Sequence, residues 1–158
     1  MGFHINPYNF DSGDEIEMFR YLRKHLKDGE LVNDVYFTGG ITNEKHNEFY
    51  FDYQKNLLEG DRISKYFPDF LIETTKGRYI VLEVKSGQEE QTYNKEKKEY
   101  EKGTITKNKI TSDPLMKEIG FNEFNKLNSN FEYHIVFNGK LLSAQESIVN
   151  RVKSLKQE

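Results

Sequence analysis

The apolar positions of the chain alternate between helical and strand-like spacing, so the sequence predicts interleaved helices and strands. The clearest helix follows Ser12, because Met18, Phe19, Leu22 and Leu26 recur on one helical face. The whole pattern predicts an α/β fold with a mixed central β-sheet flanked by helices. The expected helices cover residues 12–28, 88–101, 113–127 (with a break near Gly120) and 143–155, and the expected strands cover 31–38, 48–53, 66–74, 78–85 and 131–137.

The length and composition favour one domain over residues 1–158. Only 35% of the 158 residues are hydrophobic, but 12 Phe and 10 Tyr supply apolar bulk for a core. Cysteine is absent, which excludes disulfides and thiolate metal sites and suits a reducing cytoplasm. The four histidines lack the spacing of a zinc site. No stretch approaches the ~20 apolar residues of a membrane span, so we expect a cytoplasmic protein without membrane contact.

Two strand-like segments, 67–72 and 79–85, flank Thr75-Lys76-Gly77 and predict a hairpin with a three-residue loop. If Thr74 and Arg78 close the hairpin, Asp69 lies opposite Glu83. Lys85 then joins the same face, because side chains alternate along a strand.

The predicted face combines two carboxylates and an ammonium on strands that are otherwise apolar. Two close carboxylates repel each other unless a proton or a cation lies between them. A Mg²⁺ ion resolves this conflict, because it binds one or two carboxylates together with water and phosphate oxygens. Lys85 would then position a water or a phosphate for hydrolysis of a phosphodiester. The alternative is an exposed hairpin face on which Lys85 forms an ordinary ion pair with Asp69 or Glu83.

The segment Pro68-Asp69, the hairpin and Glu83-Val84-Lys85 together resemble the PD-(D/E)xK nuclease superfamily. A closer similarity is to the C-terminal endonuclease domain of the Res subunit of type III restriction enzymes, in which a motif like the Tyr-Asn-Phe-Asp-Ser of residues 8–12 precedes the first helix. The resemblance implies a restriction-endonuclease-like fold and Mg²⁺-dependent cleavage of DNA, with Mn²⁺ as a substitute. It also implies catalytic roles for Asp69, Glu83 and Lys85 and a metal held by Asp69, Glu83 and Val84.

This resemblance fades after Lys85, and it leaves the biological setting open. It implies a nuclease of restriction or DNA processing that works as a module with a helicase/ATPase domain or a methyltransferase-specificity subunit, or as a homodimer. Two alternatives remain: a nuclease-fold module that binds DNA or protein without cutting, and a nuclease that acts on RNA or branched DNA.

Glu15 is the candidate for a further catalytic acid from the first helix. At about 100° per residue it points into the apolar stripe, whereas Glu17 points away. The alternative is a capping box, in which the Glu15 side chain bonds back to the Ser12 backbone. Both roles are compatible with one side chain at the start of the helix.

The charge is uneven along the chain, although the net charge is only −3. Residues 1–60 contain 6 basic and 11 acidic side chains, whereas residues 91–158 contain 12 and 9. The polar helix 88–101 and the segment after it supply a candidate DNA-binding stripe of Lys95, Lys98, Lys102, Lys107 and Lys109. The alternative is a solvated helix face, with Tyr93 and Tyr100 docked on the body of the protein.

Overall fold

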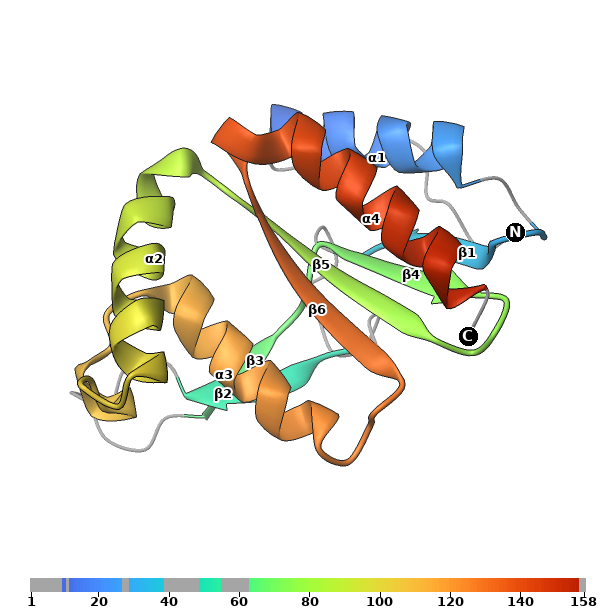
Figure 1. Cartoon of the computed structure of the whole chain (residues 1–158). Helices are drawn as coiled ribbons and strands as arrows, with labels where there is room; N and C mark the ends of the chain where they lie inside the picture. The colour runs from blue at the N-terminus through green and yellow to red at the C-terminus, as the bar shows by residue number, and fades with distance from the viewer. Residues whose placement is uncertain (1–9, 11, 27–28, 39–48, 55–62, 157–158) are drawn as a thin grey trace.

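The computed structural model describes residues 10, 12–26, 29–38, 49–54 and 63–156. They form a twisted sheet with helices on both faces (Figure 1). The helices are α1 (Gly13–His25), α2 (Gly87–Glu101), α3 (Asp113–Asn125) and α4 (Leu141–Leu155), with short 3₁₀ turns η2 (Lys107–Lys109) and η3 (Asn138–Lys140). The strands are β1 (Val32–Phe37), β2 (Phe51–Gln54), β3 (Ile63–Tyr66), β4 (Phe70–Thr74), β5 (Tyr79–Lys85) and β6 (Phe131–Phe137).

The central sheet has the strand order β1-β4-β5-β6, and β2 and β3 form a separate two-stranded sheet. β4 pairs antiparallel with both β1 and β5, whereas β6 runs parallel to β5. A parallel pair needs a long crossover, which α2 and α3 provide here. The prediction of an α/β fold with a mixed sheet flanked by helices is therefore confirmed.

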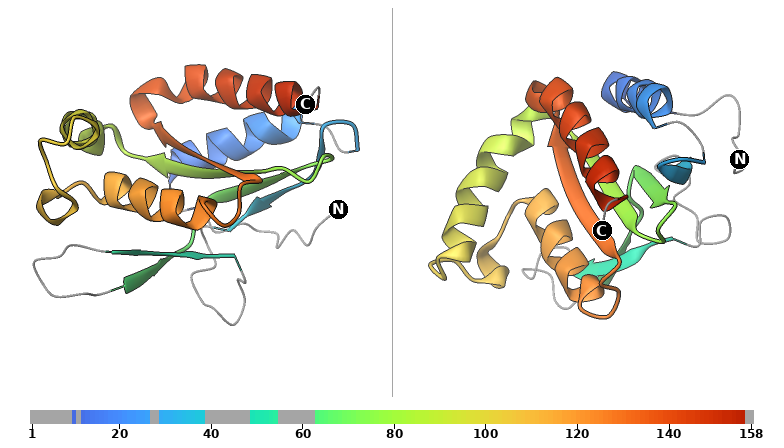
Figure 2. Two further views of the ribbon diagram at one scale, coloured as in Figure 1. Left: turned by 60° about the horizontal axis from the view of Figure 1, so that its bottom comes forward. Right: turned by 45° about the vertical axis from the view of Figure 1, so that its right-hand side comes forward.

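The two faces of the central sheet have different covers (Figure 2). α1 and α4 cover one face, where Phe70, Ile80 and Leu82 belong to the buried cluster. α3 and the β2–β3 pair lie on the other face, where Val81 belongs to a second cluster rich in aromatic side chains. The alternation of side chains along β5 therefore sends neighbouring residues into two separate cores.

The β4–β5 hairpin has the pairing that its sequence predicts. The Thr74 carbonyl oxygen accepts the Gly77 N–H, and the Thr74 N–H donates to the Arg78 carbonyl oxygen at 2.8 Å. Gly77 has φ of 70°, a conformation that a residue with a Cβ rarely adopts. The register continues to Phe70 opposite Leu82, which confirms the predicted alignment over these residues. The predicted pairing of Asp69 with Glu83 lies beyond this register and stays a prediction.

Residues 66–74 form two strands, so the prediction of one continuous strand there is wrong. β3 ends at Tyr66 and pairs with β2, and β4 begins at Phe70 in the central sheet. Pro68 lies between them and has no N–H to donate to a ladder. The Pro68 carbonyl oxygen instead accepts the hydroxyl of Thr38, just beyond the end of β1.

Helix α3 runs without a break through Gly120, contrary to the sequence prediction. Gly120 is placed where the helix crosses β2. A Cβ on Gly120 would lie 2.6 Å from the Tyr53 Cβ and 3.1 Å from the Asp52 carbonyl oxygen. The glycine permits this close approach and leaves the helix intact.

Candidate active site

Glu83 is a buried carboxylate on β5, facing α3 and only 1% exposed. Its Oε1 lies 2.7 Å from Lys85 Nζ and 2.9 Å from Lys117 Nζ. Its Oε2 has no hydrogen-bond partner among the described residues. One oxygen of this carboxylate therefore contacts two ammonium groups, and the other could accept a further ligand.

Asp69 lies just before β4, and its backbone N–H donates to the Leu82 carbonyl oxygen at 3.1 Å. Its Oδ2 accepts the Val84 N–H at 2.7 Å. If the β4–β5 pairing continued past Phe70, Val84 would lie opposite Pro68. Burial raises the pKa of Asp69 to about 6, although the Val84 hydrogen bond lowers it, and the negative charge of Glu15 adds to the rise. The pKa of Asp69 is therefore close to neutral pH, and the buried surroundings favour a cation next to this carboxylate.

Glu15 is buried near the start of α1, whereas Glu17 is exposed, as the helical spacing predicts. Ser12 is the N-cap, and its Oγ accepts the Glu15 N–H at 3.2 Å and donates to Glu15 Oε1 at 2.9 Å. The effect of Glu15 on the Asp69 pKa places its charge near the candidate site. Glu15 therefore contacts the residue that caps the helix, and its role as a further catalytic acid stays a prediction.

The motif at residues 8–12 is only partly visible in the structure. Tyr8, Asn9 and Asp11 lie outside the described residues. Phe10 packs against Phe19 and Phe37, with ring centroids 5.4 Å and 4.4 Å away. The apolar member of the motif thus helps to dock α1 on the sheet.

Lys117 is a site residue that sequence analysis missed. Besides Glu83, it contacts Asp113 Oδ2 at 3.0 Å, and its Nζ lies 4.3 Å from the centre of the Tyr66 ring. Burial alone would lower the Lys117 pKa, but Glu83 and Asp113 outweigh it and raise the pKa above the ordinary value. The i,i+4 spacing of Asp113 and Lys117 was the one local signal, and it does not indicate burial.

Two tyrosines also bring hydroxyl groups toward this buried region. The hydroxyls of Tyr66 and Tyr133 have no hydrogen-bond partner among the described residues, and their ring centroids lie 6.4 Å apart. Burial raises the pKa of Tyr133 well above its ordinary value, and the charges of Glu83 and Asp69 add to this effect. The Tyr133 hydroxyl therefore stays protonated at neutral pH.

The donor set suits a cation that needs few protein ligands. Within the described ranges, no group of three histidine, aspartate or glutamate side chains could hold a metal. Asp69 and the unpartnered Oε2 of Glu83 remain, and Mg²⁺ typically uses one or two carboxylates with water. The Val84 side chain is buried in the opposite core, so only the main-chain oxygen of this residue could contribute.

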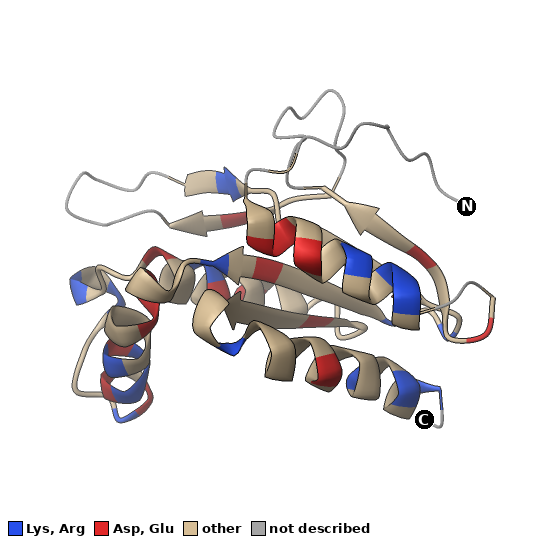
Figure 3. Cartoon of the chain, turned by 90° about the horizontal axis from the view of Figure 1, so that it is seen from above, with Lys and Arg blue, Asp and Glu red and all other residues tan. Residues whose placement is uncertain are grey.

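The candidate DNA-binding lysines lie on the surface around α2. Lys95, Lys98, Lys102 and Lys109 are exposed, and Lys107 is half-buried. Acidic and basic side chains are mixed along α2 (Figure 3). Tyr93 is docked as expected, but Tyr100 is 36% exposed and is not.

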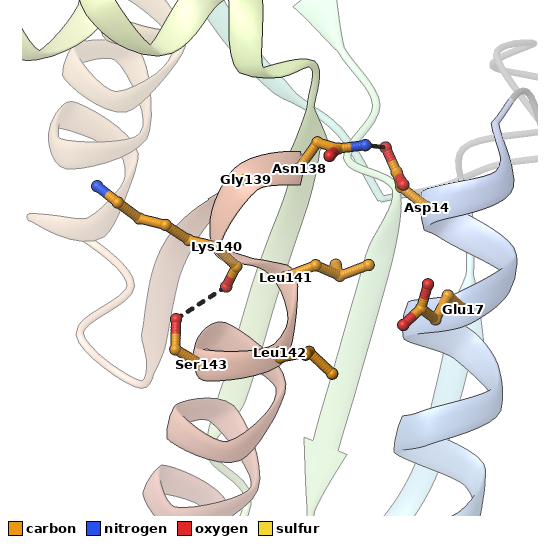
Figure 4. A pocket seen from close by; sticks show the side chains of 8 residues that line it. All are labelled: Asp14, Glu17, Asn138, Gly139, Lys140, Leu141, Leu142 and Ser143. Atoms are coloured by element: carbon orange, nitrogen blue, oxygen red, sulfur yellow. Dashed lines mark hydrogen bonds between the residues drawn. The ribbon is translucent and has the colours of Figure 1, made fainter.

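A surface pocket of about 420 Å³ lies between the start of α1 and the start of α4 (Figure 4). Asp14 and Glu17 line one side, and the segment 138–143 lines the other. Asn138 Nδ2 donates to Asp14 Oδ2 at 2.5 Å across it. None of the predicted site residues lines this pocket, so it is separate from the carboxylates of the sheet.

Comparison with known proteins finds no matching family model, no matching curated protein and no matching solved structure. Among the described residues, no helix is both long and apolar enough to cross a membrane.

Proposed function

We propose that this chain is a Mg²⁺-dependent endonuclease that hydrolyses DNA phosphodiester bonds in restriction or DNA processing. The proposal combines the resemblance to PD-(D/E)xK nucleases with the surroundings of the three residues that this resemblance singles out, Asp69, Glu83 and Lys85. The observation that supports it best is the divided environment of the Glu83 carboxylate. Oε1 has two ammonium partners, whereas Oε2 is buried without one among the described residues.

An unpartnered carboxylate oxygen is costly in a protein interior. Asp69 adds a second carboxylate whose pKa is raised to about 6, chiefly by burial. A divalent cation on Asp69 and Glu83 Oε2 would relieve both problems. The residues present thus fit Mg²⁺, with the Val84 main-chain oxygen as a further ligand.

Bound Mg²⁺ would polarise the phosphate and lower the pKa of a coordinated water. The protein's own side chains orient the reacting groups and neutralise their charge. Lys85 Nζ is anchored on Glu83 and its side chain is 21% exposed, so it can donate to a phosphate oxygen or to the attacking water. Glu15 adds negative charge next to Asp69 and so favours the cation. The lysines around α2 are the proposed contacts to the DNA backbone.

The test is cleavage of supercoiled plasmid DNA in Mg²⁺, in Mn²⁺ and in EDTA. Asp69→Ala, Glu83→Gln and Lys85→Met should each remove most of the cleavage. Lys126→Met is the matched control, because Lys126 is an exposed lysine paired with Glu123. Cleavage that persists in EDTA, or that survives all three site variants, would contradict the proposal. Parallel incubations with RNA and with a branched DNA junction determine the substrate class.

One observation favours a second candidate function, a module that binds DNA or protein without cutting. Lys85 and Lys117 together already compensate the charge of Glu83, so the carboxylate has a structural role without a metal. In that case, the purified chain would bind DNA equally well in Mg²⁺ and in EDTA, and Asp69→Ala would leave binding unchanged. A Mg²⁺-dependent retention of DNA by the wild type that Asp69→Ala abolishes would exclude this candidate.

A further inference from the structure

Two lysines converge on Glu83 Oε1, and their surroundings differ. Lys85 follows Glu83 on β5, and its side chain is 21% exposed. Lys117 comes from α3, 34 residues away in sequence, and its side chain is only 10% exposed. Lys85 is therefore accessible to a substrate, whereas Lys117 is enclosed within the protein.

Lys117 is fixed by contacts on more than one side. Its Nζ lies 3.0 Å from Asp113 Oδ2 as well as 2.9 Å from Glu83 Oε1, and it lies over the Tyr66 ring. Asp113 in turn accepts the Tyr53 hydroxyl on its other oxygen, Oδ1, at 3.1 Å. A continuous chain of polar contacts thus runs from β2 through α3 to the carboxylate on β5.

We propose that Lys117 is a positioning residue that holds Glu83 by Oε1 and thereby presents Oε2 to the divalent cation. The last torsion of a glutamate has a broad energy profile, so a carboxylate without such a partner can turn either oxygen toward a ligand. An ammonium anchored on Asp113 removes this freedom. The inference rests on the proposed function, since the cation belongs to it.

The sign of the effect distinguishes positioning from other roles. Lys117 is positively charged, so Coulomb repulsion alone predicts that Lys117→Met strengthens cation binding. A purely structural role predicts a change in melting temperature without a change in cation affinity. Positioning predicts weaker binding, by about 10- to 100-fold, the usual loss when a partner of a metal ligand is removed.

The experiment is a calorimetric titration of Mg²⁺ into the whole chain without DNA, with melting curves in EDTA to verify folding. Lys117→Met should bind Mg²⁺ about 10- to 100-fold more weakly than the wild type. Tyr53→Phe loosens the same chain without changing any charge and should weaken binding about threefold. Lys126→Met, at the exposed end of α3, should bind as the wild type does.

The outcomes for the two proposals are separate. A wild-type chain that binds no Mg²⁺ and cuts no DNA would refute the proposed function. Equal or tighter Mg²⁺ binding by folded Lys117→Met would overturn the role of Lys117 and leave the proposed function standing. If Lys117→Met does not fold, Tyr53→Phe decides, and an unchanged affinity in that variant overturns the inference.

Discussion

The Asp69→Asn substitution should stabilise the metal-free protein while it removes a proposed metal ligand. Burial and the charge of Glu15 raise the Asp69 pKa from 3.8 to about 6, so the folded chain binds this proton more tightly than the unfolded chain does. Stability from this group is therefore lost as the pH rises from about 4 to above 6. Each pH unit corresponds to about 1.4 kcal/mol, so the ionised carboxylate costs on the order of 3 kcal/mol.

The assay is urea unfolding in EDTA at a series of pH values. The asparagine side chain keeps an oxygen for the Val84 N–H and cannot ionise, so Asp69→Asn should be more stable by up to about 3 kcal/mol near neutral pH. The difference should shrink as the pH falls and vanish below about pH 4. The comparison of two chains that differ at one site cancels the titration of most other groups. Asp52→Asn, at an exposed position, is the matched control.

Urea unfolding with added Mg²⁺ separates the destabilisation caused by the buried Asp69 charge from the role of that charge in binding the metal. Added Mg²⁺ should stabilise the wild type, because a ligand that binds only the native state shifts the unfolding equilibrium. The same addition should do little for Asp69→Asn. A stability difference that does not change with pH, or one that favours the wild type at neutral pH in EDTA, would refute the reasoning.

Three further sets of substitutions test particular contacts. Glu15→Gln should lower DNA cleavage and raise the Mg²⁺ requirement, with a stability loss of about 1 kcal/mol or less in melting curves. Glu17→Gln is the control, and equal activity in the two variants would reject the catalytic role of Glu15. Gly120→Ala should destabilise the folded protein by about 1–3 kcal/mol in urea unfolding, because the new Cβ would meet Tyr53. An unchanged midpoint would show that β2 moves to accommodate the Cβ. The exposed lysines are neutralised in the variants Lys95→Gln, Lys98→Gln and Lys102→Gln. Each variant should weaken DNA binding at low salt and reduce the salt dependence of binding by about one phosphate contact. An unchanged salt dependence would show that these lysines form only a solvated face.

The sequence alone determined the features that depend on near neighbours. Gly77 supplies the positive φ of the hairpin loop, and this loop sets the pairing of Phe70 with Leu82. Ser12 caps α1 through a bond to a residue three positions away, and the 3.6-residue period turns Glu15 inward. Local geometry and hydrophobic period act within a few residues, so a linear pattern can reveal them.

Only the tertiary structure decided which distant groups meet at the site. Lys117 lies on a helix 34 residues after Glu83, and its burial depends on how α3 packs against the sheet. The tight crossing of α3 over β2 explains Gly120, whose helix would otherwise be expected to break there. The Val84 N–H bonds to the Asp69 side chain, a contact that joins β5 to the segment before β4. Each outcome depends on packing between segments that share no local pattern, since the cost of burying a charge or a Cβ is set by atoms that the chain brings together only when it folds.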